Sequence, residues 1–365
     1  MTTQTGTQIE KTRILDTAPE LSAPSASSLL DRLPLKPQDR YHFIRSIGFG
    51  GMKGVLLVHD TDTDREVAMA FMPDFRERPR QDLERFVGEA LLTARLEHPN
   101  IVPIHDIGID SNGSPFFTMK YLRGQSLAQL LARLRAGERE AVEKYTLYRR
   151  LQIFQRVCNA VDFAHSRHCC HLDIKPANVN IGDFGEVVVL DWGLASPLDD
   201  KGCALLSGDR RAKGTPGYMP PEFLSPETAK HVGVASDIYS LGGVLYALLA
   251  LSSPLSDRDP EEKLRCTATG EIPAPSEAAP AGWHVPASLE AVCRKAMALR
   301  PADRYRNVTE LRQEILAFLS GYAPQAEHAS WLRRAALFLL RNRLALVIIM
   351  LLVTVLVLLS YRLTH

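Results

Sequence analysis

The feature that most constrains this chain is a polar loop that is followed by a short apolar run and a second acidic residue. The loop reads His171-Leu-Asp-Ile-Lys-Pro-Ala-Asn178, and Val187–Leu190 then precedes Asp191-Trp-Gly193. This order supplies an aspartate, a lysine, an asparagine and a second aspartate. Phosphoryl transfer needs such groups: a carboxylate to orient a hydroxyl, a cation for the phosphate, and two oxygen ligands for Mg²⁺.

These residues resemble the catalytic and metal loops of eukaryotic-type protein kinases, particularly the Ser/Thr kinases found in bacteria. The resemblance implies that Asp173 orients the substrate hydroxyl and accepts its proton, and that Lys175 neutralises the γ-phosphate. It also implies that Asn178 and Asp191 bind Mg²⁺. An ordinary loop can hold any one of these residues, but a histidine followed by Asp-x-Lys-Pro-x-Asn is rarely accidental.

A second acidic triplet, Asp183-Phe-Gly185, has the letters of the family's metal motif. It lies too close to Asp173 and precedes the apolar run 187–190 instead of following it. We therefore interpret it as a turn between two short strands. Asp191 is the predicted metal ligand, with Trp192 in place of the usual phenylalanine.

The segment Gly48-Phe-Gly-Gly-Met-Lys-Gly-Val55 resembles the glycine-rich loop that covers the ATP phosphates. Glycines there let backbone N–H groups approach the phosphates without a Cβ clash. On its own, such a cluster is commonly only a hairpin turn. Met119-Lys-Tyr-Leu122 falls where the adenine hinge belongs, although a plain strand end is a competing interpretation. The residues that the resemblance assigns to nucleotide binding are Gly48, Gly50, Gly51, Val55, Ala68, Met119, Lys120, Tyr121 and Leu122.

One expected residue is missing. The strand Glu66-Val-Ala-Met-Ala70 resembles the one that carries the family's ATP-binding lysine, but Ala70 stands at the lysine position. Glu89 lies on the following predicted helix, where the lysine's partner is expected. A unit charge near 4 Å from a phosphate oxygen is worth about 4 kcal/mol at an effective dielectric of ~20, so its loss lowers the rate by on the order of 10³.

Lys53 is the predicted replacement. It occupies the third glycine position of the loop, and the with-no-lysine kinases show the same exchange at matching positions. The small side chain of Ala70 leaves space for a lysine that reaches across from the neighbouring strand. The alternative is that Lys53 points from its loop into solvent.

The resemblance implies an α+β, bilobal protein-kinase-like fold with a β-rich small lobe and an α-rich large lobe. Alternating segments at 55–58 and 67–72, separated by a polar turn, predict an antiparallel meander. Apolar residues from Leu83 to Ala94 repeat at helical spacing. The kinase domain is predicted over residues 39–322. Residues 1–38, rich in Thr, Ser, Pro and Gln, predict a disordered arm.

Further matches support the fold more than the activity. Gly214–Glu222 resembles the end of the activation segment, where Thr215 is characteristic of Ser/Thr specificity. The resemblance implies that Glu222 pairs with Arg304 and that Asp237 supports the backbone of the catalytic loop. Leu172 replaces the arginine through which many members sense activation-loop phosphorylation, so that switch is not favoured here.

The C-terminal residues predict a membrane helix. Residues 344–361 carry no charge and are framed by Arg341, Arg343 and Arg362. A juxtamembrane segment is expected over 323–343 and a short tail over 362–365. Because the arginines gather on the N-terminal side, the kinase domain is expected to face the cytoplasm from the cytoplasmic (inner) membrane. Membrane lipid is accordingly a predicted partner.

The net charge and the cysteine spacing argue against nucleic-acid binding and against a disulfide or metal framework. A formal net charge of +1 offers no field for nucleic acid, which is not an expected partner. Six cysteines without Cys-x-x-Cys spacing suit a reducing cytoplasm better than a disulfide or metal framework.

The expected function is a membrane-anchored Ser/Thr protein kinase that uses ATP and Mg²⁺ and acts on protein Ser/Thr hydroxyls. The leading alternative is a pseudokinase that binds nucleotide or acts as a scaffold at the membrane. Ala70, Leu172 and Trp192 favour that alternative, whereas the retained Asp173 and its partners oppose it. A small-molecule kinase of related fold is a weaker possibility, because Gly214–Glu222 resembles a platform for protein substrates.

Overall fold

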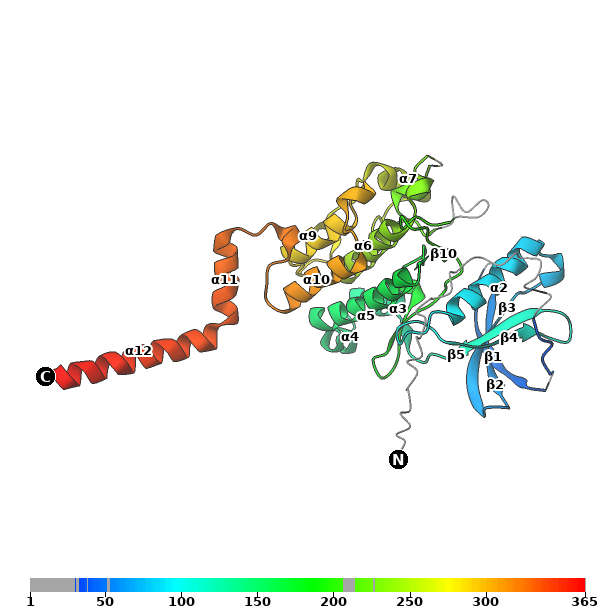
Figure 1. Ribbon diagram of the computed structural model, residues 1–365, viewed down its shortest axis with the longest axis horizontal. Coiled ribbons are helices and arrows are strands. Elements are labelled where there is room, and N and C mark those ends of the chain that lie inside the picture. Colours follow the sequence, from blue (N-terminus) through cyan, green and yellow to red (C-terminus); the bar gives the residue numbers. More distant parts are fainter. Residues whose placement is uncertain are drawn as a thin grey trace, which may run out of the picture.

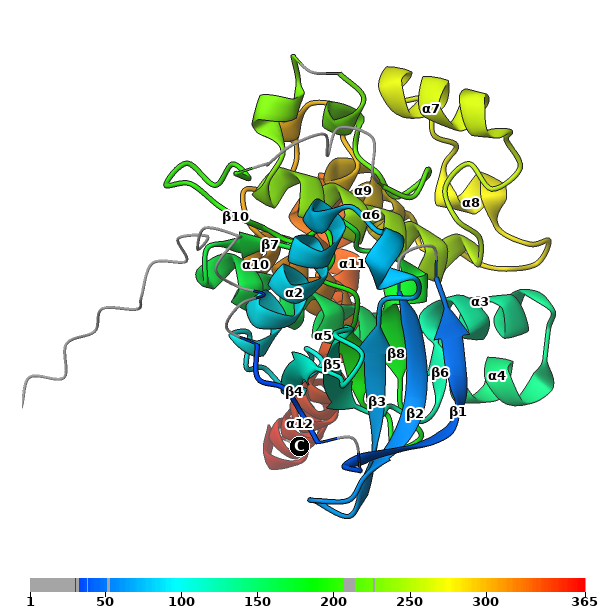
Figure 2. The same ribbon diagram turned by 90° about the vertical axis from the view of Figure 1, so that its right-hand side faces the viewer.

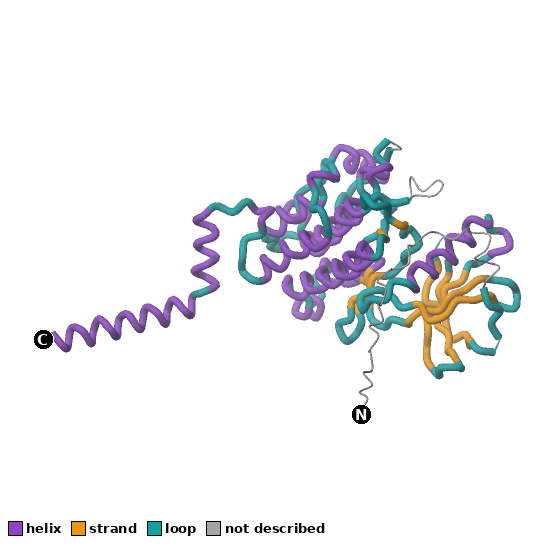
Figure 3. Tube along the Cα trace, viewed as in Figure 1, coloured by secondary structure: helices purple, strands orange, loops and turns teal. Residues whose placement is uncertain are grey.

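The computed structural model describes residues 30, 33–37, 39–50, 53–205, 214–225 and 227–364, except for the side chains of 345, 346, 357 and 362–364. The chain forms a small lobe dominated by a sheet and a larger lobe dominated by helices (Figures 1 and 3). Two further helices extend away from the large lobe toward the C-terminus (Figure 1). The predicted α+β bilobal fold is therefore confirmed.

The small lobe is an antiparallel sheet in the order β1-β2-β3-β5-β4. Helix α2 (Arg80–Ala94) lies over one face of this sheet (Figure 2). Its apolar stripe packs Phe86 and Val87 against Ala70 and Phe117, which closes a small core. The strands are β1 (Tyr41–Phe49), β2 (Gly54–Asp60), β3 (Arg65–Phe71), β4 (Ile104–Ile109) and β5 (Pro115–Lys120), and a 3₁₀ turn, η1 (Phe75–Glu77), precedes α2.

The large lobe is built around α6 (Val234–Ala250), which is buried along nearly all its length. Its contacts with α5 (Leu147–Ser166) and α9 (Ala287–Ala296) form the main hydrophobic core. The other helices are α3 (Leu127–Arg135), α4 (Arg139–Lys144), α7 (Pro260–Thr269), α8 (Pro275–Ala278) and α10 (Val308–Leu319).

Short strands and turns carry the functional loops. The strands are β6 (Gln125–Ser126), β7 (Cys169–Cys170), β8 (Val179–Ile181), β9 (Val187–Val189) and β10 (Ser196–Pro197). The 3₁₀ turns of this lobe are η2 (Pro176–Asn178), η3 (Pro221–Phe223), η4 (Ala229–His231), η5 (Pro301–Asp303) and η6 (Gln325–Glu327). Strands β8 and β9 pair in register and fix the catalytic loop on one side and Asp191 on the other.

The predicted disordered arm is too long at its C-terminal end. Leu35 bridges Ile109 in parallel, and the Lys36 backbone N–H donates to the Ile109 carbonyl at 3.0 Å. Lys36 also forms an ion pair with Asp106. Residues 33–37 are therefore tied to β4, because the apolar edge of the small lobe accepts another extended segment. Residues 1–29, 31, 32 and 38 lie outside the described part of the chain.

The C-terminal residues form α11 (Trp331–Arg341) and α12 (Arg343–Thr364). Over the part of the chain that the structure describes, none of the helices combines the length and apolar character that crossing a bilayer requires. The structure therefore does not support the transmembrane helix predicted for 344–361, in which the side chains at 345, 346 and 357 are not described. The predicted juxtamembrane segment 323–343 contains η6 and α11.

Candidate active site

The catalytic loop is held by one buried carboxylate on α6. Asp237 accepts hydrogen bonds from the backbone N–H groups of His171 and Leu172, both at 2.8 Å. His165 Nε2 lies 2.8 Å from the same carboxylate. Since Leu172 has a left-handed backbone, with φ of 65°, these bonds hold a turn that a leucine would not adopt unaided. The structural role predicted for Asp237 is confirmed.

Three side chains converge on Asp173. Lys175 Nζ donates to its Oδ2 at 2.7 Å, and Asn178 Nδ2 donates to the same oxygen at 3.2 Å. Lys175 also donates to Thr215 Oγ1 at 2.8 Å, and that hydroxyl lies 3.4 Å from Asp173 Oδ1. The structure thus unites the predicted base, cation and amide with the threonine of the activation segment.

Asp191 lies two residues after β9 and has a left-handed backbone, with φ of 60°. Trp192 is buried beside it, and its ring centroid lies 4.5 Å from that of His171. The triplet Asp183-Phe-Gly185 lies in the turn between β8 and β9, and Phe184 is 95% exposed there. The interpretation of Asp183-Phe-Gly185 as a turn between short strands is confirmed.

Lys53 lies just before β2, and its ammonium group contacts two carboxylates. Nζ forms an ion pair with Glu89 on α2 and a second one, at 2.8 Å, with Asp191 Oδ1. Its side chain is only 24% exposed, so it does not point into solvent. In the sheet, Val55 lies directly opposite Ala70. Lys53, the residue before β2, therefore places its ammonium group on the side of the sheet where Glu89 lies.

Burial and ion pairing compete in this cluster. Burial lowers the pKa of Lys53, but the Glu89 and Asp191 carboxylates outweigh it, and the net shift of the Lys53 pKa is upward. Burial raises the pKa of Glu89 despite the lysine beside it. For Asp191, Lys53 overcomes the effect of burial and lowers the pKa. Lys53 and Asp191 are therefore held in their charged forms.

The predicted nucleotide-binding residues line adjoining strands. Gly48 and Gly50 end β1 and its turn, whereas Gly51 lies outside the described residues. A Cβ at Gly48 would meet nothing within 4 Å, so the space above this backbone is open. Ala68 lies opposite Met119 on β5.

The hinge follows β5. The Lys120 backbone N–H donates to the Pro103 carbonyl at 3.1 Å, so that group is already used within the lobe. Tyr121 accepts a hydrogen bond from Arg45 Nη2 at 2.8 Å, which ties the hinge to β1. Leu122 comes next and is half-buried. The predicted pairing of adenine with the Lys120 backbone is thus restricted to its carbonyl.

The donors available for Mg²⁺ are an amide and a carboxylate. Asn178 uses Nδ2 toward Asp173, which leaves its Oδ1 as an acceptor, and Asp191 offers carboxylate oxygens. Two oxygen ligands suit Mg²⁺ where phosphates and water complete the shell. Within the described residues, no group of three or more His, Cys, Asp or Glu side chains is placed to hold a metal ion.

The activation segment is anchored at its end by a buried ion pair. Arg304 donates from both terminal nitrogens to the two oxygens of Glu222, each at 2.8 Å. This confirms the predicted pairing. Leu172 packs in an apolar cluster with Met219 and Phe223. It stands at the position where the resemblance implies a charged arginine.

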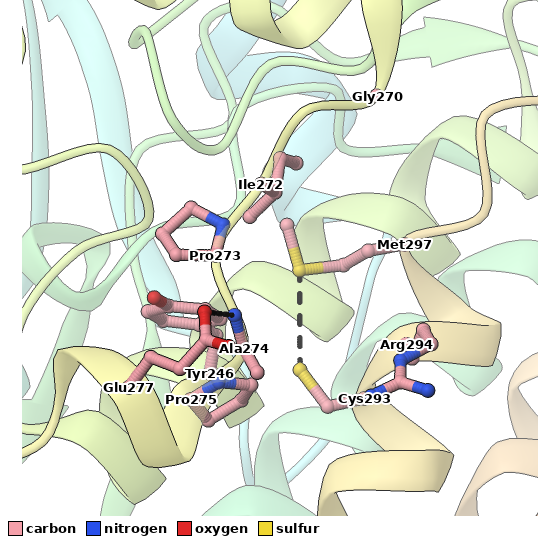
Figure 4. Close-up of a pocket in the computed structure, with 10 residues that line it drawn as sticks. All are labelled: Tyr246, Gly270, Ile272, Pro273, Ala274, Pro275, Glu277, Cys293, Arg294 and Met297. Atoms are coloured by element: carbon pink, nitrogen blue, oxygen red, sulfur yellow. Dashed lines mark hydrogen bonds between the residues drawn. The ribbon is translucent and has the colours of Figure 1, made fainter.

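Two cavities lie away from these residues. One of about 300 Å³ is a half-open pocket in the large lobe, lined by α6, the segment 270–277 and α9, where Cys293 Sγ and Met297 Sδ are 3.9 Å apart (Figure 4). Another of about 290 Å³ lies in the small lobe beside Tyr41 and Phe116. Neither is lined by a predicted site residue, so neither is the expected nucleotide site.

Fold and site together define a protein kinase domain. The chain matches the protein kinase domain family over residues 41–316 and belongs to that family. It is similar to serine/threonine-protein kinase PknD of Chlamydia trachomatis serovar D, with 36% identity over 311 residues, or 77% of this chain and 32% of the relative. The PknD proteins of Chlamydia pneumoniae (35% over 300 residues, 78% and 31%) and Protochlamydia amoebophila (34% over 308 residues, 79% and 31%) are also similar. The chain spans about a third of the length of these relatives.

Sequence reasoning missed several residues that shape the site. Asn100 donates from Nδ2 to the Val187 carbonyl at 2.8 Å and so joins the small lobe to β9. Arg45 fixes the hinge tyrosine. The contacts span long stretches of chain, and a local pattern carries no signal for them.

Proposed function

We propose that this chain is a Ser/Thr protein kinase, which transfers the γ-phosphate of ATP to a serine or threonine hydroxyl of a protein, with Lys53 in place of the usual strand lysine. The observation that carries the proposal is the double ion pair of Lys53 with Glu89 and Asp191. A cation at this position supplies the charge that Ala70 lacks.

The residues around Asp173 would perform the transfer. Asp173 orients the attacking hydroxyl and takes its proton, while that oxygen bonds to the γ-phosphorus and the bond to the ADP oxygen breaks. Lys175, held at 2.7 Å from Asp173, would offset charge on the transferred group. Asn178 and Asp191 would hold Mg²⁺, which when bound neutralises the phosphate oxygens.

The contacts of Thr215 support a hydroxyl substrate on a short side chain. Its Oγ1 accepts from Lys175 and lies beside Asp173, so the activation segment passes close to the proposed base. A serine or threonine hydroxyl lies close to the peptide backbone, whereas a tyrosine hydroxyl lies much farther out. The tight approach of Thr215 to Asp173 therefore favours Ser and Thr.

Replacing Lys53 tests the proposal. Lys53→Met removes the ammonium group, and we expect kcat/KM for ATP to fall by on the order of 10³. The matched control is Lys144→Met, because Lys144 is an exposed lysine on α4 away from the site. Peptide phosphorylation with radiolabelled Mg-ATP measures both. If Lys53→Met leaves ATP affinity and turnover unchanged, the proposal that Lys53 replaces the strand lysine is wrong.

The pseudokinase remains the competing function, and one observation favours it: Lys53 engages Asp191, the proposed metal ligand, at 2.8 Å. Asp173→Asn separates the two functions. For an enzyme, wild type labels a protein substrate and Asp173→Asn does not. For a pseudokinase, neither labels it, although both bind nucleotide.

We further propose that α12 attaches the kinase domain to the cytoplasmic face of a membrane. The support is the charge-free sequence 344–361 between arginines. We expect the full chain to stay with membranes after an alkaline wash, and Leu352→Arg to release it, because a charge in the centre of an inserted helix is costly. Recovery of the wild-type chain in the wash would contradict the anchor.

A further inference from the structure

Helix α11 turns one face to the large lobe. Arg333, Leu337 and Arg341 are four residues apart and therefore lie on the same face. Arg333 Nε lies 3.2 Å from a Glu327 carboxylate oxygen, and the Arg341 guanidinium lies 3.8 Å from the centroid of the Tyr322 ring. Leu337 between them is half-buried. These contacts fix which side of α11 faces the kinase domain.

The opposite face of α11 is apolar and exposed. It carries Trp331, Leu332, Ala335, Phe338 and Leu339, all of them exposed. Trp331 is 75% exposed. Ser330 accepts a hydrogen bond from the Arg333 backbone N–H and begins the helix there, so the phase of this face is set. A contiguous apolar face of this kind marks an interaction surface.

The charge around α11 indicates what covers that face. No aspartate or glutamate follows Glu327, whereas Arg333, Arg334, Arg341, Arg343 and Arg362 do. Helices with Trp, Phe and Leu on one face and arginine on the other lie in the boundary of a membrane. Arginines are also attracted to the negative surface of anionic lipids. A membrane surface with anionic lipids therefore matches both the exposed apolar face of α11 and the arginines around that helix.

The chain path agrees with such a surface. Helix α11 ends before Asn342, whose backbone is not helical, and α12 begins at Arg343. The chain turns sharply there, so the two helices point in clearly different directions (Figure 1). If α12 attaches the chain to a membrane as proposed above, this turn lets α11 lie along the membrane surface.

We propose that α11 is an interfacial helix, which lies on an anionic membrane with the face of Trp331, Leu332, Ala335, Phe338 and Leu339 in the lipid. This inference rests on the membrane attachment proposed above and adds a fixed orientation to it. Because Arg333 and Arg341 hold the large lobe on the other side, the lobe sits on the water side of α11 with Tyr322 and Glu327 nearest the bilayer.

Trp331 fluorescence tests the inference on the full chain. The chain is reconstituted into vesicles of phosphatidylcholine and phosphatidylglycerol, with phosphatidylcholine brominated near the top of its acyl chains as the quencher. The difference between wild type and Trp331→Phe isolates Trp331 from Trp192 and Trp283. We expect loss of most of the Trp331 emission in brominated vesicles, and a smaller loss when phosphatidylglycerol is left out.

Two variants of matched chemistry control the result. Leu339→Gln changes the apolar face and should restore Trp331 emission, whereas Leu337→Gln changes the lobe side and should not. If the chain floats with vesicles but Trp331 is quenched only by an aqueous quencher, the interfacial helix is wrong and the anchor stands. If the chain does not float, both fail. Protection of Trp331 in detergent that increases with protein concentration would point to a second copy instead, and overturn the inference.

Discussion

Thr215 illustrates how one hydroxyl can organise a catalytic group. It accepts from Lys175 and lies beside Asp173, so the lysine is shared between the activation segment and the proposed base. Without the hydroxyl, Lys175 would keep its hydrogen bond to Asp173 and lose the one to Thr215. Thr215 is thus a positioning residue, which acts through the two side chains it contacts.

Thr215→Ala should lower kcat by roughly fivefold, since a hydrogen bond contributes about 1 kcal/mol and 1.4 kcal/mol would be a factor of ten. KM for ATP should change little, because Lys175 and Asp173, the residues that Thr215 contacts, act on the group being transferred and not on the adenine. Thr215→Ser keeps the hydroxyl and should recover most of kcat. Steady-state kinetics on a serine peptide measures this split. An unchanged kcat in Thr215→Ala would show that the contact has no catalytic role.

At the scale of residues, the sequence alone predicted that Asp173, Lys175 and Asn178 lie together. Asp173, Lys175, Asn178 and Asp191 have fixed spacing because strands β8 and β9 set their separation. The meeting of Lys53 with Glu89 was expected from the small residue at Ala70. Asn100 and Arg45 could not be predicted, because their partners lie far away along the chain and their own surroundings look like ordinary surface.

Among the elements, the sheet edge of the small lobe depends on a charged network. Arg40 donates to both oxygens of Asp60, at 2.9 and 3.1 Å, and to Asp106 at 2.8 Å. The hydrogen bond from Arg40 lowers the pKa of Asp60 from 3.8 to about 2. Arg40 thereby joins the segment before β1 to β2 and β4.

Asp60→Asn should lower the free energy of unfolding by about 2 kcal/mol at pH 7, as its pKa shift implies. A depressed acid pKa stabilises the fold above the unfolded pKa near 3.8, and this contribution is lost as pH falls toward about 2. The difference between wild type and variant should therefore shrink between pH 4 and pH 2. Urea unfolding at several pH values measures it.

Asp62→Asn is the matched control, because Asp62 also lies 3.1 Å from Arg40 but its side chain is 64% exposed. Exposed ion pairs contribute little, so this change should cost less than about 1 kcal/mol at any pH. Equal effects of the two substitutions would show that burial of Asp60 does not decide its contribution.

Elements with a clear apolar repeat in their own sequence were predicted. Segments whose structure depends on pairing with another part of the chain were not. The repeat from Leu83 to Ala94 corresponds to α2, and the meander to β1, β2 and β3. Residues 33–37 were assigned to a disordered arm because residues 1–38 taken together are rich in Thr, Ser, Pro and Gln. Their pairing with β4 depends on an open strand edge, which the segment's own sequence does not show.

In the whole molecule, the lobes are joined by more than the hinge. The stretch after α2 reaches the large lobe, where the Val189 N–H donates to the Asn100 carbonyl at 2.8 Å and Ile101 bridges Val189. The ion pair of Lys53 with Asp191 adds a second link. The relative position of the lobes is therefore coupled to β9, and the proposed metal ligand Asp191 lies two residues after that strand.

Asn100→Ala should lower the free energy of unfolding by about 1–3 kcal/mol, because it leaves the buried Val187 carbonyl without its side-chain donor. It should also lower kcat, since Asp191 follows β9. Asn112→Ala, in the exposed turn between β4 and β5, is the control and should be near neutral. Thermal melts and peptide kinetics measure both effects. Loss of stability without loss of turnover would separate the lobe contact from catalysis.

The position of Lys53 has a practical consequence for chemical proteomics. Acyl-phosphate analogues of ATP acylate the amine nearest the phosphates, and trypsin does not cut after an acylated lysine. The label should therefore appear on a peptide covering residues 46–65, whereas the peptide of residues 66–76 from β3 contains no lysine at all. A survey that searches only for labelled peptides from β3 would classify this chain as a protein that does not bind ATP.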